Sequence, residues 1–251
     1  MTMISGDVLT ELMSVIGGSD AVELKLTVPD SHHRSTGDAL DLDPVQAEIR
    51  QVVFFDTPDL ALNEVGLVVR ARRMPGGLGD TVVKLRPVVP DQIPGELRSS
   101  GKVSVEVDAM PGGHVCSASM KGKGDADAVR RVARGQDRLG SILSKSQKTF
   151  FKTYAPKGLR LRDLSPLGPI NILKLKFSPE TLGRKMVAEL WLYPNGTRIL
   201  ELSTKCAPAE AFQVAAEARA FLASEGIDLD GEQQTKTKTA LEFFSGALQA
   251  D

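Results

Sequence analysis

The sequence predicts an α+β protein whose strands curl into an antiparallel eight-stranded β-barrel with flanking α-helices. About eight or nine segments alternate apolar residues with small or charged ones, which is the period of a half-buried strand. Most of these segments follow one another through hairpin turns or short helices. Such short connections favour antiparallel pairing and a sheet that closes on itself, with the helices outside.

Composition sets broad limits on what the chain can be. The 251 residues are 41% hydrophobic and 25% charged, as expected for a globular protein with a sizeable core. The net charge of −1 points to no specific nucleic-acid partner, so a basic site must be local. Cys116 and Cys206 lie far apart without CxxC spacing, which argues against a disulfide framework or a zinc site. Residues 1–18 do not form a signal peptide and no apolar run is long enough to span a bilayer, so we expect a cytoplasmic protein without a membrane partner.

Strands in the first half of the chain have one apolar and one charged face. In residues 21–27, Glu23 and Lys25 share a face opposite Val22 and Leu24. Residues two apart on a strand lie roughly 6–7 Å apart on the same side, so both charged groups can reach one ligand. Strands of this design are predicted at residues 21–27, 67–73, 81–86 and 102–108, and a further strand is predicted at residues 48–56. Helices are predicted at residues 6–16 and 59–64.

The second half is less regular. Four glycines between residues 111 and 127 predict a mobile loop, and short helices are predicted at residues 126–134 and 137–143. The turn Pro194-Asn195-Gly196 between two alternating runs is a strong hairpin signal. The remaining predicted strands are 148–154, 171–178, 186–193 and 197–205, and the remaining predicted helices are 209–224 and 235–247. We expect a single domain over residues 1–251, with barrel strands within 20–205 and C-terminal helices within 206–251.

Positive charge is concentrated on the charged faces of these strands. They carry eleven basic side chains and five acidic ones, although the whole chain has a net charge of −1. A solvated face usually mixes the two signs, and in that interpretation these faces are only the outer side of a sheet. If they line the barrel instead, they form a channel for a polyanion, in which carboxylates could hold a divalent metal ion. The apolar faces would then pack against helices 6–16 and 209–224.

Several motifs resemble those of the CYTH superfamily of triphosphate tunnel metalloenzymes. Phe54-Phe-Asp-Thr-Pro-Asp-Leu-Ala-Leu62 is similar to the superfamily's aromatic-Asp-Thr-Pro segment, and Arg70-Ala-Arg72 to its Arg-x-Arg strand. Ser104-Val-Glu-Val-Asp108 is similar to its central acidic strand. The resemblance covers roughly residues 20–245. The superfamily includes thiamine triphosphatases, class IV adenylate cyclases and inorganic triphosphatases.

The resemblance implies a role for individual residues. A triphosphate-containing small molecule or polyphosphate would be bound by Lys25, Arg70, Arg72, Lys84, Lys148 and Lys238, together with Arg86, which alternation places beside Lys84. Lys84 is the residue implied in catalysis. A Mg²⁺ or Mn²⁺ ion would be held by Glu23, Glu189 and Glu201, since these ions prefer hard oxygen ligands.

Two positions depart from the superfamily's motifs. Its Glu-x-Glu-x-Lys strand is Ala21-Val-Glu23-Leu-Lys25 here, and its final Glu-x-Glu is Glu201-Leu-Ser203, so each motif lacks one carboxylate of the metal site. One interpretation is metal-dependent hydrolysis of a triphosphate substrate. A second is a non-catalytic protein that binds polyphosphate, nucleotide or another polyanion. An adenylate cyclase and an interaction module without a ligand are further alternatives.

Overall fold

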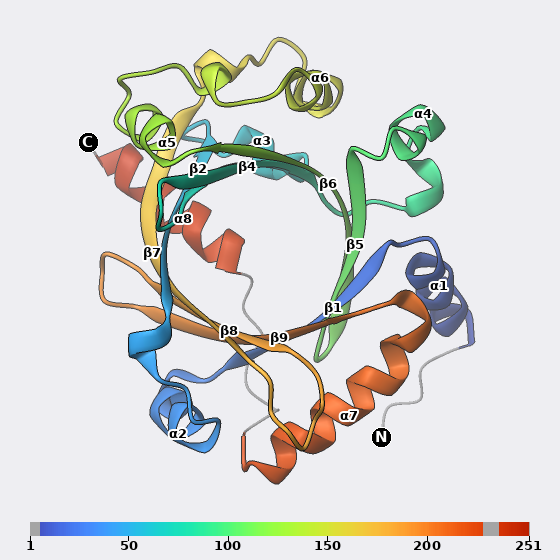
Figure 1. Ribbon diagram of the computed structural model, residues 1–251. Coiled ribbons are helices and arrows are strands. Elements are labelled where there is room, and N and C mark those ends of the chain that lie inside the picture. Colours follow the sequence, from blue (N-terminus) through green and yellow to red (C-terminus); the bar gives the residue numbers. More distant parts are fainter. Residues whose placement is uncertain (1–5, 228–235, 251) are drawn as a thin grey trace.

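Over residues 6–227 and 236–250, which the computed structural model describes, nine strands close into one barrel, seen along its axis in Figure 1. Around the barrel the strands follow the order β1-β5-β6-β4-β3-β2-β7-β8-β9, and β9 pairs with β1 to close it. The strands are β1 Ala21–Val28, β2 Glu48–Asp56, β3 Leu67–Arg73, β4 Leu78–Leu85, β5 Val103–Met110, β6 Gly113–Asp125, β7 Ser165–Phe177, β8 Met186–Leu192 and β9 Arg198–Cys206. The closed barrel is confirmed.

The prediction of eight antiparallel strands is wrong in number and in one pairing. β1 runs parallel to β5, with Ala21 opposite Glu106, whereas the other neighbouring pairs are antiparallel. The reason is that β2 pairs with β3 and β7, far from β1 around the barrel. β1 therefore lies between strands that come much later in the chain, and no hairpin dictates its direction.

Strand β6 occupies most of the segment predicted as a mobile loop. It pairs with β4 on one side and with β5 on the other. One of its glycines, Gly122, allows a close approach of neighbouring groups: a Cβ added there would lie 2.6 Å from Oε1 of Gln147 and 2.7 Å from Oγ1 of Thr81. Here glycine marks tight packing within a strand and not a loop.

Residues 148–154, predicted as a strand, belong to helix α6, Lys145–Tyr154. The helix begins at a capping box. The backbone N–H of Gln147 donates to Ser144 Oγ (3.2 Å), and the backbone N–H of Ser144 donates to Gln147 Oε1 (2.9 Å). Phe150 and Phe151 are buried against the barrel. The helix predicted at 137–143 is reduced to a 3₁₀ turn, Leu139–Ser141.

The other helices lie outside the strands or at an end of the barrel. They are α1 Gly6–Gly17, α2 His33–Ala39, α3 Ala61–Glu64, α4 Gly95–Ser99, α5 Ala126–Ala133, α7 Ala211–Ser224 and α8 Lys236–Ala250. The helices predicted at 6–16, 126–134 and 209–224 are confirmed within two residues at each end, and that at 59–64 is shortened to α3. The predicted start of the last helix, Thr235, lies outside the described residues. Among the described helices, none combines the length and apolar character that crossing a membrane requires.

The outward faces of the strands form the main core with the surrounding helices. Val22, Val69 and Val105 on the strands belong to the same buried cluster as Phe150 of α6 and Val214 of α7. Figure 1 shows α1 and α7 outside β1 and β9, and α5 and α6 beyond β4 and β6. Because the apolar faces point outward to these helices, the alternate charged faces must point into the barrel.

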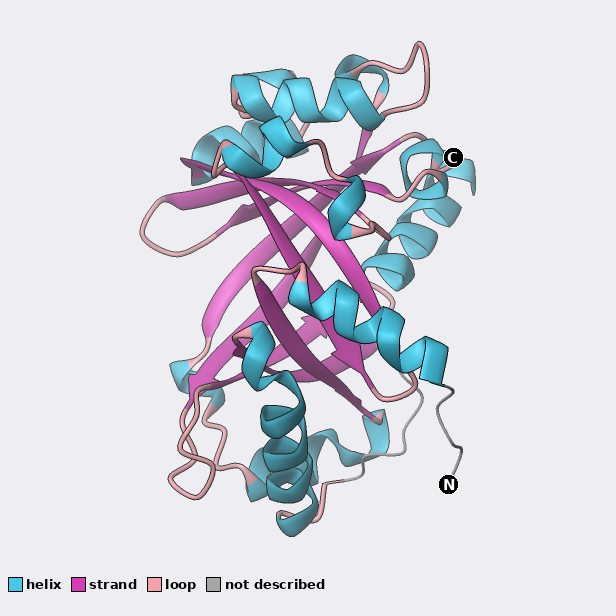
Figure 2. Cartoon of the chain, turned by 90° about the vertical axis from the view of Figure 1, so that its right-hand side faces the viewer, coloured by secondary structure: helices cyan, strands magenta, loops and turns pink. Residues whose placement is uncertain are grey.

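A second apolar cluster lies inside the barrel at one end. Phe54, Ile170 and Trp191 alternate with outward-facing residues and pack with Ala240 and Leu241 of α8. The side view shows the helix that leads to the C-terminus at one end of the strands (Figure 2). Helix α8 therefore closes one end of the barrel, and its first residues lie next to the charged interior.

Candidate functional site

The charged strand faces line a cavity of about 240 Å³ inside the barrel, which we call the tunnel. Among the described residues, ten basic and five acidic side chains line it, so their summed formal charge is strongly positive although the chain as a whole has a net charge of −1. The basic residues are Lys25, Arg50, Arg70, Arg72, Lys84, Arg86, Lys121, Lys174, Lys205 and Lys236, and the acidic residues are Glu23, Glu106, Asp108, Glu189 and Glu201.

The tunnel brings together most of the residues selected from the sequence. Lys25, Arg70, Arg72, Lys84, Arg86, Glu23, Glu189 and Glu201 all line it. Lys148 does not, because its segment is helix α6 and its side chain is exposed outside the barrel. Lys238 does not either: on α8 its side chain is 67% exposed, with Nζ 3.8 Å from Oε1 of Glu242.

Asp108 lies between two tunnel lysines. Its Oδ1 is 3.0 Å from Nζ of Lys25, and its Oδ2 is 3.3 Å from Nζ of Lys84. Burial alone would raise the pKa of Asp108, but the two ammonium groups outweigh it and hold the pKa below its ordinary value. Asp108 is therefore a carboxylate at neutral pH and compensates part of the positive charge here.

The two lysines beside Asp108 differ in pKa. Burial disfavours the charged form of Lys25, but the carboxylates of Glu23, Asp108 and Glu201 outweigh burial and raise its pKa. For Lys84, burial lowers the pKa to about 8. Asp108 opposes this shift, but the nearby positive charges of Lys25 and Arg86 add to it. Lys84 can therefore change its protonation state near neutral pH.

Arg70 and Arg86 differ from the other tunnel arginines in their lack of a direct ion pair with a described carboxylate. Arg72, by contrast, makes a two-pronged contact with Asp80, with Nε and Nη2 at 2.8 and 2.5 Å from its two oxygens. Among the described side chains, neither Arg70 nor Arg86 has such an ion-pair partner, and Nε of Arg70 is buried without a hydrogen bond. Burial lowers the pKa of Arg70 to about 10, which still leaves it charged at neutral pH. A buried donor of this kind can bind an acceptor oxygen of a ligand.

Glu189 and Glu201 face the tunnel from adjacent strands and share one lysine. Nζ of Lys236, at the start of α8, is 2.7 Å from Oε2 of Glu189 and 2.7 Å from Oε1 of Glu201. Oε1 of Glu189 also accepts a hydrogen bond from Lys174 Nζ at 2.9 Å. Burial would raise the pKa of Glu189, but Lys236 and Lys174 hold it far below its ordinary value. Both carboxylates are thus already engaged by ammonium groups.

The three carboxylates predicted to bind a metal ion do not form a metal site in this arrangement. No group of three or more His, Cys, Asp or Glu side chains with metal-binding geometry occurs in the described part of the chain. Glu23 faces Lys25 (3.4 Å) instead, while Glu189 and Glu201 hold Lys236. The departures at Ala21 and Ser203 remove the carboxylates that could have completed a site, and Ser203 lies opposite Lys25 in the sheet. These residues do not fit Mg²⁺ or Mn²⁺.

Sequence reasoning selected only part of the tunnel lining. The residues it did not select are Arg50, Glu106, Asp108, Lys121, Lys174, Lys205 and Lys236. Glu106, for example, is 3.0 Å from Lys121 and 2.8 Å from Lys205, whose hydrogen bonds outweigh burial and lower its pKa to about 2. The alternation of the predicted strands placed Glu106, Asp108, Lys174 and Lys205 on charged faces, and this signal could have identified them. Lys121 lies in the segment whose glycines predict a loop, and Lys236 lies outside any strand pattern.

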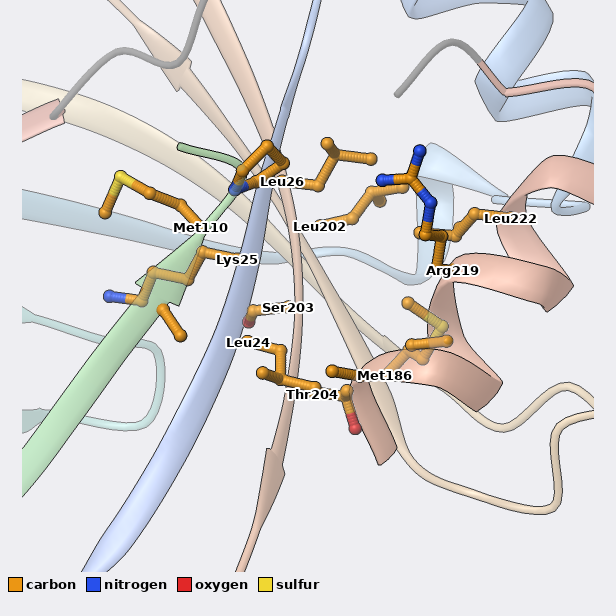
Figure 3. A pocket seen from close by; sticks show the side chains of 14 residues that line it. Leu24, Lys25, Leu26, Met110, Met186, Leu202, Ser203, Thr204, Arg219 and Leu222 are labelled. Atoms are coloured by element: carbon orange, nitrogen blue, oxygen red, sulfur yellow. The ribbon is translucent and has the colours of Figure 1, made fainter. Parts of the chain in front are cut away.

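A second pocket of about 240 Å³ lies outside the barrel, between β1, β9 and helix α7. Leu26, Leu202 and Leu222 are among its lining residues, and its surface is mostly apolar. Figure 3 shows Arg219 on the α7 side and Lys25 extending away from it. This pocket contains none of the tunnel carboxylates and only one tunnel lysine, Lys25, so the tunnel is the stronger candidate for a functional site.

Comparisons with known proteins identify the fold. No protein-family model matches the chain, and no curated protein sequence matches it. Among solved structures, it is similar to the putative adenylyl cyclase HpAC1 from Hippeastrum, described as having a dominant triphosphatase activity. The TM-score is 0.62 at 17% identity, over 88% of this chain and 95% of that one. It is also similar to a putative adenylate cyclase from Bacillus halodurans, with a TM-score of 0.60 at 11% identity over 88% and 97% of the two chains. The chain thus has the fold of these CYTH-type proteins, and the resemblance seen in its sequence is confirmed at the level of the fold.

Proposed function

We propose that the tunnel binds the triphosphate group of a small molecule, or inorganic polyphosphate. The observation that carries this proposal is the pair Arg70 and Arg86, which form no ion pair with a described carboxylate, within a lining of ten basic and five acidic described side chains. A guanidinium group matches phosphate oxygens in geometry and donates two parallel hydrogen bonds to them. A chain of phosphates supplies several such acceptors in a row.

The positions of the cations favour an extended polyanion over a single small anion. Arg70 and Arg72 extend from β3, Lys84 from β4 and Lys25 from β1, on different parts of the barrel wall. Their mutual repulsion contributes to the lowered pKa values of Arg70 and Lys84, and a bound polyanion would relieve it. The triphosphatase activity in the description of HpAC1 supports the triphosphate group as the ligand.

Hydrolysis of the bound triphosphate is the second candidate, and Lys84 favours it. With a pKa of about 8, Lys84 can donate a proton to a leaving phosphate oxygen or hold one that attacking water releases. Formation of a cyclic nucleotide is the alternative reaction, in line with the descriptions of both similar structures. The two reactions differ in their products, and binding precedes either.

Calorimetric titration with inorganic tripolyphosphate tests binding. We expect Arg70→Ala and Arg86→Ala each to weaken the affinity about 10- to 100-fold, because each removes charge-assisted hydrogen bonds. Lys148→Ala is the matched control, since it removes an exposed positive charge outside the barrel, and it should bind as the unaltered protein does. Absence of binding, or equal effects of all three substitutions, would refute the proposal.

Product analysis then tests turnover. Phosphate release from tripolyphosphate and cyclic AMP formation from ATP are measured with EDTA, with Mg²⁺ and with Mn²⁺. Release that disappears in Lys84→Ala supports hydrolysis, whereas cyclic AMP supports the cyclase. Tight binding without either product leaves the tunnel as a binding site only.

A further inference from the structure

Two carboxylates that face each other directly in the tunnel share a single ammonium group. Glu189 and Glu201 are register partners on β8 and β9. Carboxylates directly opposite each other on neighbouring strands repel, and burial strengthens the repulsion. Nζ of Lys236 lies 2.7 Å from an oxygen of each, so it bridges the pair. A bridging divalent cation would make the same two contacts.

We propose that the Lys236 ammonium is the resident cation of this tunnel, standing where a divalent metal ion would bridge Glu189 and Glu201, so that the tunnel binds its polyanion without a metal. The part of this inference that concerns the polyanion rests on the function proposed above. The part that concerns Lys236 and the two carboxylates stands on the geometry alone.

Several contacts hold Lys236 in this position. Its side chain is only 10% exposed, and Nζ lies 5.0 Å from the centre of the Trp191 ring, a favourable cation–π distance. The Tyr193 hydroxyl donates a hydrogen bond to the Lys236 carbonyl at 3.1 Å, which fixes the start of α8. Further along, Leu241 is buried in the inner apolar cluster. The packing of α8 thus fixes the backbone from which the Lys236 side chain extends.

Among the described side chains, the charges in direct contact within this cluster are balanced without a metal ion. Glu189 and Glu201 contribute two negative charges, and Lys174 and Lys236 contribute two positive ones. A divalent ion placed here would add uncompensated positive charge next to Lys236, so it would have to displace the lysine. Among the described residues, Ala21 and Ser203 supply no further carboxylate that could hold such an ion against this competition.

Manganese binding measured by electron paramagnetic resonance, with no phosphate present, tests the inference directly. We expect weak Mn²⁺ binding by the unaltered protein and binding tighter by about tenfold or more in Lys236→Met, because that substitution removes the ammonium group from Oε2 of Glu189 and Oε1 of Glu201. Lys236→Arg keeps a cation between them and should not gain affinity. Lys238→Met is the matched control: it removes an exposed lysine two residues along the same helix and should behave as the unaltered protein does. Adding Glu201→Gln to Lys236→Met should abolish the gain.

Two results would overturn the inference. One is tight Mn²⁺ binding by the unaltered protein that Glu201→Gln removes, a measurement that does not require Lys236→Met to fold. The other is a Lys236→Met protein with an unchanged melting temperature and no gain in Mn²⁺ affinity.

The two proposals fail in distinguishable ways. If tripolyphosphate does not bind, the proposed function is wrong, but the Mn²⁺ titrations still decide the role of Lys236. If tripolyphosphate binds only when a divalent ion is present, the proposed function is supported and the inference about the resident cation is wrong. Equal tripolyphosphate affinity in EDTA and in Mn²⁺, corrected for chelation in solution, is the result we expect.

Discussion

Lys84 is the side chain in the tunnel whose charge responds most readily to pH. Burial lowers its pKa to about 8, so it is charged at pH 7 and mostly neutral at pH 9. We therefore expect the affinity for tripolyphosphate to fall by about 5- to 30-fold as the pH rises through this window, since one charge-assisted hydrogen bond is lost. In Lys84→Arg this part of the pH dependence should disappear, because arginine stays protonated.

The comparison between the unaltered protein and Lys84→Arg separates the pH dependence due to Lys84 from that due to the ligand. Tripolyphosphate titrates in the same pH range, but its own protonation affects the unaltered protein and Lys84→Arg equally. Calorimetry above pH 8 in buffers of different ionisation enthalpy should also show a proton taken up on binding, since a bound anion raises the pKa of Lys84. Coincident pH profiles for the two proteins would contradict this account.

Which tunnel residues could be predicted depends on the element that carries them. On a strand, the period of two places Lys25, Arg70 and Lys84 on one side once the apolar side is known. Helix α8 offers no comparable rule. Lys236 and Lys238 are two residues apart, and only the docking of the helix in the barrel end decides which of them reaches the tunnel. The resemblance to the CYTH superfamily selected Lys238, which is exposed.

At the scale of elements, Gln147 joins helix α6 to the barrel wall. Its Nε2 donates to the carbonyls of Thr81 on β4 (3.1 Å) and Met120 on β6 (3.2 Å), and the side chain is buried. We expect Gln147→Ala to lower the free energy of unfolding by about 2–4 kcal/mol, because two buried carbonyls lose a donor and the helix loses part of its cap. Urea denaturation measures this.

Lys148→Ala is the control for the same helix. It alters the next residue, which is exposed, and should change the free energy of unfolding by no more than about 0.5 kcal/mol. A Gln147→Ala protein as stable as Lys148→Ala would show that the helix is held by its phenylalanines alone.

The two mispredicted elements, β6 and α6, meet at this same contact. Residues 148–154 alternate like a strand, but Gln147, Phe150, Phe151 and Tyr154 also follow helical spacing. Both periods fit so short a segment, and the capping box at Ser144 decides in favour of the helix. In β6, the glycine that suggested a loop is required by the side chain of Gln147. Local pattern could not show that the two segments touch.

At the scale of the molecule, the net charge gives no sign of the basic tunnel, whereas the alternation of charged residues along the strands predicts it. The chain has a net charge of −1, yet its interior cavity carries twice as many basic as acidic side chains. Repulsion among buried cations opposes folding, so a polyanion that neutralises them should stabilise the whole barrel.

Thermal unfolding with tripolyphosphate measures this stabilisation. At a ligand concentration about one hundred times the dissociation constant, binding contributes about 2.7 kcal/mol. For a chain of this size we expect the melting temperature to rise by about 5–10 °C. Arg70→Ala at the same ligand concentration should show a much smaller rise. Sodium sulfate at matched ionic strength controls for screening, and an equal rise with sulfate would contradict a specific site.

The position of β1 between β5 and β9 has a consequence for the protein's synthesis. Val22 of β1 pairs with Cys206 of β9. The first strand to be synthesised, β1, can therefore pair with β9 only after the last strand has been synthesised. Until then the sheet has two open edges, and Lys25, Arg70 and Lys84 face water in an unclosed sheet. The proposed ligand site is therefore completed in a single late event, when β9 closes the ring. A nascent chain that ends before residue 198 should have no affinity for polyphosphate, however well its earlier strands have formed.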